Sequence, residues 1–207
     1  MINVAEVFVG TRALGPGLRT VIWVQGCPFH CKGCYSPEWI PNIPAKLYTP
    51  QDLATLVLSR PDIEGITLSG GEPFIQSEEL VEFLTLIKKQ SNKNVICFSG
   101  FRFSFLLQHP SPSVQGMLRL IDVLIDGPYV QEKETSKGLR GSTNQHIYHF
   151  TSTLLFHDFI NQERVNEIHI SGSELLAIGI PSPEIKALFG FNNKCGSQPK
   201  EHLYERA

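Results

Sequence analysis

Blocks of apolar residues separated by polar turns dominate the first two thirds of the chain, and their spacing predicts strands that alternate with helices. The β-branched, apolar runs at 3–9 and 19–24 predict two strands that lead into a cysteine-rich loop. At Thr49 the pattern changes, because threonine favours a helix cap, Pro50 suits the first helical position and apolar residues then recur on one helical face. We therefore expect a helix that begins at Thr49 and ends near Pro61.

The central part of the chain repeats a unit of strand, loop and helix. The predicted strands are residues 65–69, 94–98 and 121–125, and the predicted helices begin at Ser77 and span 103–108 and 114–120. Each of these strands runs into a turn that contains glycine. Because strands alternating with helices form a parallel sheet, we expect the turns to meet at one face of it.

The last quarter of the chain is less regular. Residues 137–144 are polar and glycine-rich, which is typical of a loop. The segments 167–170 and 174–178 flank a short turn and predict a hairpin, and a final helix is expected to begin at Ser182. We expect a single domain over residues 1–191, followed by a polar tail over 192–207.

Composition and charge exclude several classes of function. The 207 residues include 18 Lys and Arg against 20 Asp and Glu, so the formal net charge of -2 predicts no broad basic face for nucleic acid or an anionic membrane. The N-terminal residues lack a basic segment followed by a long apolar run, and we expect a cytoplasmic protein. The five cysteines are an odd number, which fits a reducing compartment better than a disulfide framework.

Three of those cysteines, Cys27, Cys31 and Cys34, lie within eight residues. Thiolates select iron–sulfur clusters, zinc or copper(I), and a cubane cluster normally takes four protein ligands. Three ligands from one loop would leave one iron open, and we expect function to reside at that iron.

A zinc site or a fully ligated cluster would need a fourth ligand. His30 is the local candidate, but its position beside Cys31 makes it sterically awkward. More distant residues that could complete such a site are Cys97, His169 and Cys195. No spacing rule excludes these alternatives.

A second motif, Gly70-Gly71-Glu72-Pro73, directly follows a predicted strand. Paired glycines let a ligand approach the backbone closely, and exposed carbonyl groups together with Glu72 can accept hydrogen bonds from an ammonium group. In isolation the motif would predict only a tight turn. Its position about forty residues after the clustered cysteines gives it more weight.

Together the two motifs resemble the radical S-adenosylmethionine superfamily. That resemblance implies an incomplete (βα)6-type parallel barrel, a partial TIM barrel, with the active site at the carboxyl ends of its strands. It also implies a 4Fe-4S cluster held by Cys27, Cys31 and Cys34, with S-adenosylmethionine on the open iron. The residues implied to hold the methionine amino group are Gly70, Gly71, Glu72 and Pro73.

A closer resemblance is to the anaerobic ribonucleotide reductase activating proteins, which are glycyl-radical enzyme activating enzymes. It rests on the segments 26–35, 126–128 and 139–145, and 172–181 resembles their closing hairpin. The wider superfamily often has an aromatic residue before the third cysteine, where this chain has Gly33. Further residues expected to border the cofactor are Gly33, Cys34, Tyr35, Ser99, Asp126, Gly127, Pro128, Arg140 and Asn144.

The resemblance implies that the bound cofactor is cleaved reductively to a 5'-deoxyadenosyl radical, which takes a hydrogen atom from a glycine of a partner reductase. A flavodoxin or ferredoxin is expected to deliver the electron. Two alternatives stay open: a radical enzyme that acts on a small metabolite, and a non-catalytic iron–sulfur or zinc protein. Added sequence near 150–165 makes the partner surface differ from that of compact members.

Several remaining residues receive no role in this site. We expect Cys97 to be a small buried thiol on a strand, and Cys195 stays unassigned. The histidines His146, His149 and His157 are close in sequence, but histidines in such a segment are more often surface or hydrogen-bonded side chains than metal ligands.

Overall fold

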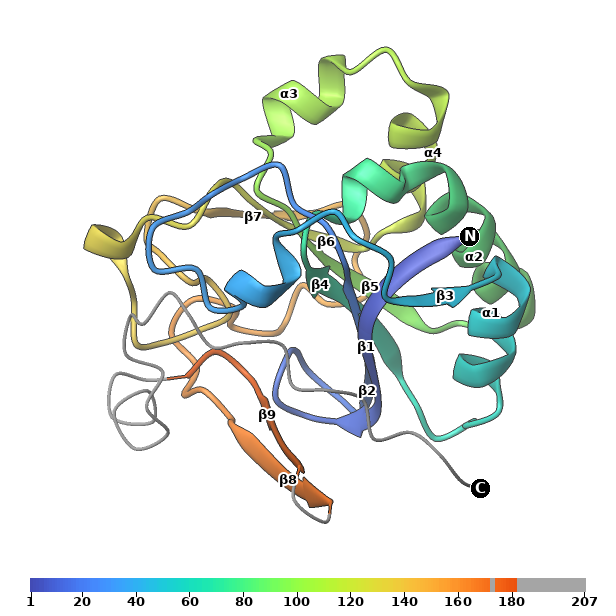
Figure 1. Ribbon diagram of the computed structural model, residues 1–207, viewed down its shortest axis with the longest axis horizontal. Coiled ribbons are helices and arrows are strands. Elements are labelled where there is room, and N and C mark those ends of the chain that lie inside the picture. Colours follow the sequence, from blue (N-terminus) through green and yellow to red (C-terminus); the bar gives the residue numbers. More distant parts are fainter. Residues whose placement is uncertain (172–173, 182–207) are drawn as a thin grey trace.

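A computed structural model describes residues 1–171 and 174–181 of the chain (Figure 1). Its main sheet has seven strands in the order β3-β1-β2-β4-β5-β6-β7, and β8 and β9 form a separate hairpin. The strands are β1 (Ile2–Thr11), β2 (Arg19–Val24), β3 (Lys46–Tyr48), β4 (Gly65–Gly70), β5 (Asn94–Phe98), β6 (Val123–Asp126), β7 (His146–His149), β8 (Glu167–Ser171) and β9 (Glu174–Ile178). The helices are α1 (Pro50–Leu58), α2 (Ser77–Gln90), α3 (Phe103–Gln108) and α4 (Pro112–Leu120), with 3-10 turns η1 (Pro37–Trp39), η2 (Pro73–Gln76) and η3 (Gln131–Lys133).

The sheet is mixed, and the expectation of an incomplete (βα)6-type barrel is wrong. The pairs β2–β4, β4–β5 and β5–β6 are parallel, whereas β1 pairs antiparallel with β2 and β3, and β7 pairs antiparallel with β6. The physical reason lies in the connections, because a parallel neighbour needs a long crossover while β1 and β2 are joined by a short turn. No α-helix joins β6 to β7, so β7 returns beside β6 in the opposite direction.

The helix and strand predictions for the central part of the chain are confirmed. Helix α1 begins where predicted, with the Thr49 hydroxyl accepting a hydrogen bond from the Asp52 amide at 3.0 Å. Helices α2 and α3 begin at Ser77 and Phe103, and α4 begins two residues before the predicted position, at Pro112. The hairpin of β8 and β9 is also confirmed, whereas the predicted helix from Ser182 and the tail lie outside the described residues.

Helices α1, α2 and α4 cover one face of the sheet (Figure 1). On that face alternate residues of β2 and β4, such as Ile22 and Leu68, pack against apolar helix residues such as Leu53, Phe83 and Met117. All of these side chains are fully buried, and burial of each is worth about 1.5–3 kcal/mol. The helices therefore fix the four parallel strands against one another.

The opposite face of the sheet is covered by different elements. Val21 and Trp23 of β2 pack with Ile178 and Ile180 at the end of the β8–β9 hairpin, and Ile96 and Val123 contribute to a neighbouring cluster with Leu139, Leu154 and Phe159. Because β2 has buried residues on both faces, it lies in the interior of the molecule, as is usual for parallel strands.

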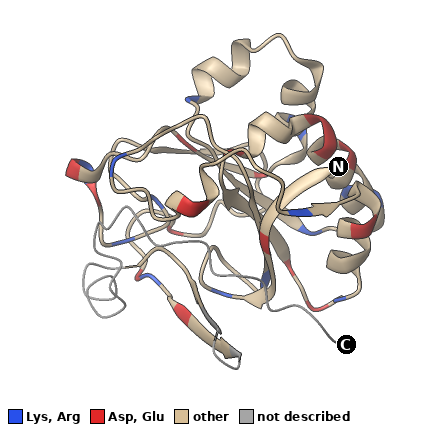
Figure 2. Cartoon of the chain, in the orientation of Figure 1, with Lys and Arg blue, Asp and Glu red and all other residues tan. Residues whose placement is uncertain are grey.

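Charged residues lie mainly on the outer helices and loops and both signs are interspersed (Figure 2). Residues 103–118, which form α3 and most of α4, contain no Asp, Glu, Lys or Arg. Within the described part of the chain, no helix combines the length and the apolar character that a membrane span requires.

Candidate metal centre

The loops that follow the four parallel strands β2, β4, β5 and β6 surround one open cavity of about 190 Å³. Such loops commonly carry the binding site in sheets with parallel strands. The predicted site residues that line this cavity are Cys27, Cys31, Cys34, Tyr35, Gly70, Gly71, Glu72, Ser99 and Gly127. Residues from four separate parts of the sequence thus reach one cavity.

Other predicted residues lie near the cavity but do not line it. These are Gly33, Pro73, Asp126, Pro128, Arg140 and Asn144. Pro73 begins the turn η2. Arg140 and Asn144 belong to the loop between β6 and β7, where Arg140 donates to the Gln145 carbonyl at 3.2 Å and the Asn144 amide donates to the Pro128 carbonyl at 2.9 Å. In the structure these two side chains hold the loop itself.

The cysteine loop leaves β2 through Gly26, whose φ of 95° is easily adopted only by glycine. Its first part is tied to the turn η1: the Gly26 amide donates to the Trp39 carbonyl at 2.9 Å, and the Cys27 amide donates to the Ile40 carbonyl at 3.0 Å. At its other end the Cys34 amide donates to the Cys31 carbonyl at 3.1 Å, which closes a tight turn.

The three thiols of the loop are partly buried and influence one another electrostatically. Burial raises the pKa of the Cys27 thiol to about 11, and the nearby Glu72, Cys31 and Cys34 raise it as well. Burial likewise raises the pKa of Cys34. Without a cation, Cys27 and Cys34 would stay protonated at neutral pH, whereas a coordinated metal removes the thiol proton.

The donor set fits an iron–sulfur cluster. Three soft sulfur ligands from one loop line the same cavity, and thiolates are the usual ligands of such clusters. Within residues 1–171 and 174–181, no three His, Cys, Asp or Glu side chains converge on one point as ligands of a single metal ion do.

The alternative ligands that belong to the described residues lie elsewhere. Neither His30 nor Cys97 lines the cavity, and Cys97 is completely buried in the core beneath the helices. His169 also lies outside the cavity lining: its Nε2 is 3.1 Å from Glu167 Oε2, and its ring packs on Phe8 at 4.3 Å. Cys195 lies outside the described residues. Among the described candidates, the cavity wall therefore contains just the three cysteines of the loop.

The glycine motif lies directly beside the cysteine loop. The Gly71 amide donates to the Val24 carbonyl at 2.7 Å, and the Glu72 amide donates to the Gly26 carbonyl at 2.9 Å. A Cβ atom at Gly71 would overlap the Gly26 carbonyl oxygen, so this close approach requires glycine. The close approach at Gly71 thus brings the turn after β4 against the start of the cysteine loop.

Glu72 is a fully buried acid in the cavity wall. Its carboxylate accepts hydrogen bonds from the amides of Phe74 and Gly100, at 3.0 and 2.7 Å, and from the Ser99 hydroxyl at 2.9 Å. Burial raises the pKa of Glu72 to about 7 although these hydrogen bonds lower it. The Phe101 amide also lowers the pKa of Glu72 as a hydrogen-bond donor, so a cation in the cavity would share the carboxylate oxygens with these donors.

Asp126 differs from Glu72 because its carboxylate is engaged mainly by neighbouring elements. One oxygen accepts from the Phe103 amide at 2.6 Å at the start of α3, and the other accepts from the His146 amide at 3.1 Å. The His146 Nδ1 atom is also 3.1 Å from Asp126. The prediction that Asp126 borders the cofactor stays a prediction, and in the structure this residue joins β6, α3 and β7.

Sequence reasoning missed the cavity residues Phe29 and Tyr129, and it named the 139–145 segment without singling out Gln145. Gln145 accepts from the Gly141 amide at 2.8 Å and donates to the Gly127 carbonyl at 2.8 Å, so it joins the two ends of the loop between β6 and β7. Its place at the end of the 139–145 motif was the available signal, but the pattern could not indicate which side chain of that motif reaches the cavity.

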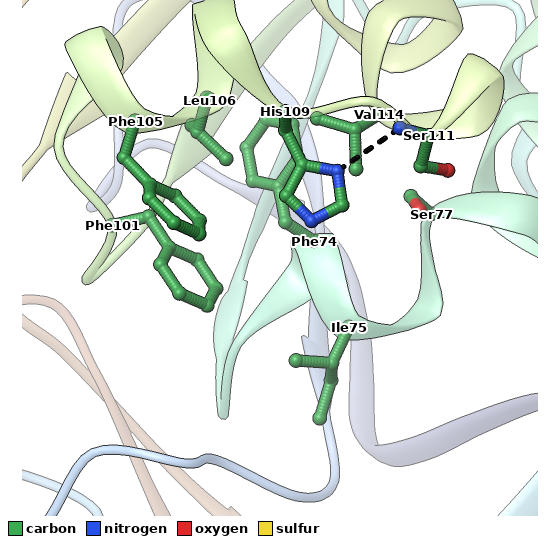
Figure 3. Close-up of a pocket in the computed structure, with 9 residues that line it drawn as sticks. All are labelled: Phe74, Ile75, Ser77, Phe101, Phe105, Leu106, His109, Ser111 and Val114. Atoms are coloured by element: carbon green, nitrogen blue, oxygen red, sulfur yellow. Dashed lines mark hydrogen bonds between the residues drawn. The ribbon is translucent and has the colours of Figure 1, made fainter.

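A second cavity of about 250 Å³ lies between η2, α3 and α4 (Figure 3). Figure 3 shows the stacked rings of Phe101 and Phe105 on one side and His109 near its centre, with the Ser111 amide donating to His109 Nδ1 at 3.2 Å. Phe101 also contacts Phe29 of the cysteine loop, at 4.9 Å between ring centroids. The two cavities are thus neighbours, and the predicted site residues line the first one.

Comparison with known proteins identifies the family. The model of a family described as a 4Fe-4S single cluster domain matches residues 13–148. An anaerobic ribonucleoside-triphosphate reductase-activating protein of Enterobacteria phage T4 is 33% identical over 149 residues, which cover 70% of this chain and 92% of that relative. The chain belongs to this family of activating proteins.

Other activating proteins of the family agree with this assignment. The activating protein of Vibrio cholerae is 34% identical over 147 residues, covering 66% of this chain and 91% of the relative. That of Escherichia coli K12 is 31% identical over 144 residues, covering 65% of this chain and 90% of the relative. The family therefore supports an iron–sulfur cofactor, which agrees with the three thiols that line the cavity.

Proposed function

We propose that this activating-protein family member is a radical S-adenosylmethionine enzyme that installs a glycyl radical in an anaerobic ribonucleoside-triphosphate reductase. Its Cys27, Cys31 and Cys34 hold a 4Fe-4S cluster, and the turn that contains Gly70, Gly71 and Glu72 binds the amino group of the cofactor. The single observation that carries the proposal is the cavity in which the three thiols and this turn meet.

When bound, the cluster and the cofactor would supply the chemistry, which is one-electron reduction of the sulfonium to methionine and 5'-deoxyadenosine with a hydrogen atom taken from a glycine Cα of the partner. The residues of this chain bind and orient. Glu72 supplies an acceptor for an ammonium group, and an adjacent positive charge favours its ionised form. The glycines keep the backbone open to close approach.

The electron donor and the compartment complete the proposal. We assign the donor role to a flavodoxin or ferredoxin, since a single electron must reach a cluster near the surface of the protein. Free thiols in the loop fit the reducing conditions of a cytoplasm without oxygen.

The test is an anaerobic assay of the full chain. The protein is reconstituted with iron and sulfide, reduced with dithionite and mixed with S-adenosylmethionine, and methionine and 5'-deoxyadenosine are quantified with and without a candidate reductase. We expect both products and, with the reductase, a persistent doublet in the electron paramagnetic resonance spectrum.

The outcomes separate the three functional hypotheses. A reconstituted cluster that never cleaves the cofactor would reject both enzyme hypotheses and favour a non-catalytic iron–sulfur protein. Cleavage without a glycyl doublet in any anaerobic reductase would favour a small-metabolite substrate. Binding of one zinc ion in place of a cluster would reject the proposal entirely.

A further inference from the structure

We propose that Glu134 is a positioning residue for the third thiolate ligand, Cys34, and that it acts through Tyr35. This inference rests on the proposed function, because the ligand role of Cys34 belongs to it. The Tyr35 hydroxyl donates to Glu134 Oε1 at 2.7 Å, a short hydrogen bond to a carboxylate. Since Tyr35 directly follows Cys34, this bond joins the end of the cysteine loop to the loop between β6 and β7.

Packing around Tyr35 supports the same arrangement. The Tyr35 ring lies against the Tyr129 ring, with 4.9 Å between centroids and an interplanar angle of 48°. A Cβ atom at Gly141 would lie 3.1 Å from the Tyr129 ring and 3.3 Å from the Tyr35 ring. The two aromatic rings and the backbone at Gly141 therefore pack closely, and Tyr35 has little freedom to turn away from Glu134.

Gly33 makes a second contact with the turn η3. Its φ is 72°, and a Cβ atom there would lie 2.9 Å from the Cδ atom of Gln131. A side chain at position 33 would therefore strain the backbone and displace Gln131. The glycine before the third cysteine, where related superfamily members often have an aromatic residue, thus lets the cysteine loop close onto η3.

The segment that carries Glu134 is fixed by its own hydrogen bonds. Glu134 and Ser142 form an antiparallel bridge, the Thr143 amide donates to the Lys133 carbonyl at 2.7 Å, and the Thr135 amide donates to the Gly141 carbonyl at 3.2 Å. Glu134 therefore acts from a rigid support, which a positioning residue requires.

The two ends of the cysteine loop are held in different ways, and this gives Glu134 its importance. Cys27 is fixed by the backbone bond to Ile40, whereas the amide of Cys34 bonds within the loop, to Cys31. The contacts that join this end of the loop to the segment around η3 include the side chain of Tyr35, the close approach at Gly33 and the exposed pair of Lys32 with Glu132. Partners that orient a metal ligand affect metal retention strongly, by roughly 10–100-fold on mutation.

The experiment compares Glu134→Ala and Tyr35→Phe with a matched control on the same turn, Glu132→Ala. Glu132 pairs with Lys32 at 3.3 Å, but both side chains are exposed, so this pair contributes little. The reconstituted proteins are mixed anaerobically with an iron chelator, and the rate of iron release and the spectrum of the reduced cluster are recorded. Thiol alkylation of the metal-free proteins is followed by mass spectrometry.

We expect iron release to be roughly tenfold faster in Glu134→Ala and Tyr35→Phe, with a changed spectrum, and unchanged within about twofold in Glu132→Ala. In the metal-free proteins, the alkylation rate of Cys34 relative to Cys27 should rise roughly tenfold in the same two variants, the factor expected for a lost hydrogen bond to a charged group. Glu134→Gln, whose amide oxygen still accepts from Tyr35, should restore both values.

Wild-type rates in both Glu134→Ala and Tyr35→Phe would overturn the inference while leaving the proposed function intact. Should Glu134→Ala fail to fold, Tyr35→Phe still decides, because it keeps the ring that packs on Tyr129. If the wild-type protein assembles no cluster, the proposed function fails, and the alkylation ratio alone then tests whether Glu134 positions Cys34.

Discussion

The amino and carboxyl ends of the parallel strands each carry one buried ionisable residue, and the two residues differ in their surroundings. At the amino end, Arg19 begins β2 and donates to Thr67 Oγ1 at 2.8 Å, to Asn94 Oδ1 at 2.7 Å and to the Ile66 carbonyl at 2.6 Å. At the carboxyl end, Glu72 follows β4 and lies in the wall of a cavity. Both side chains are fully buried.

Burial disfavours the charged form of both side chains, but the groups around the two side chains differ. It lowers the pKa of Arg19 to about 9 and raises the pKa of Glu72 to about 7. Neutral acceptors of the protein bind the Arg19 guanidinium, and the carboxylates of Asp122 and Glu64 favour its charge, so Arg19 holds β2, β4 and β5 together. Glu72 faces a cavity where a ligand can supply the missing positive charge. The difference teaches that equal burial serves stability at one end of the sheet and binding at the other.

Removal of a thiol at the carboxyl end should have the largest effect, because a cluster with two protein ligands is poorly held. We expect Cys31→Ala to lose nearly all cluster iron and Cys97→Ala, a buried cysteine outside the cavity, to keep it at a stability cost of about 1–2 kcal/mol. Iron content and the absorbance spectrum after anaerobic reconstitution measure both. Equal iron in the two variants would contradict the ligand role.

Replacement of Arg19 should be the largest perturbation of stability. Arg19→Met leaves the acceptors of Thr67, Asn94 and Ile66 without their donor, and we expect a loss of roughly 3–5 kcal/mol in the free energy of unfolding. Urea denaturation of the metal-free protein measures it, with the exposed Arg60→Met as control. A loss similar to that of the control would mean that the amino ends of the parallel strands do not depend on the hydrogen bonds of Arg19.

The Glu72 carboxyl group should make stability depend on pH in the metal-free protein. Its pKa is about 7 in the folded chain and about 4.3 when unfolded, so the folded state binds the proton more tightly. The resulting stability is present below about pH 4.3 and is lost as the pH rises through about 7, by on the order of 3 kcal/mol. Urea denaturation from pH 4 to 8 should show this slope, and Glu72→Gln should remove it.

Asp126 provides the smallest effect and the sharpest contrast with Glu72. Asp126→Asn replaces one carboxylate oxygen, which accepts from the start of α3 or from β7, with an amide group. We expect the free energy of unfolding to fall by about 1–2 kcal/mol, as measured by thermal denaturation. Binding of S-adenosylmethionine to the reconstituted protein should change much less than in Glu72→Gln. A greater loss of binding in Asp126→Asn would restore Asp126 as a residue that borders the cofactor.

The sequence predicted local elements well and long-range pairing poorly. Thr49 and Pro50 fixed the start of α1 because cap and proline effects act within one turn. The barrel was wrong because the direction of β1 and β7 depends on partners distant in sequence. Strand β7, with the sequence His-Ile-Tyr-His, was missed because histidine carries little strand signal, and it is stabilised by pairing with β6.

In the candidate site, too, local motifs could be predicted from the sequence and long-range contacts could not. The cysteine and glycine motifs could be located because spacing within a short loop survives any change of fold. Which side chain of the 139–145 loop reaches the cavity could not be read from the pattern, because Gln145 does so through a turn whose hydrogen bonds cross the loop. The hydrogen bond between Tyr35 and Glu134 joins residues that are 99 positions apart, and no local pattern connects them.

The backbone bonds from Gly71 to Val24 and from Glu72 to Gly26 extend the pairing of β2 and β4 beyond the strands themselves. Any lengthening or shortening of the segment between Val24 and Cys27 would therefore slide the first thiol past the acidic turn. The pairing therefore fixes the number of residues in this segment, and the positive φ of Gly26 fixes the identity of one of them.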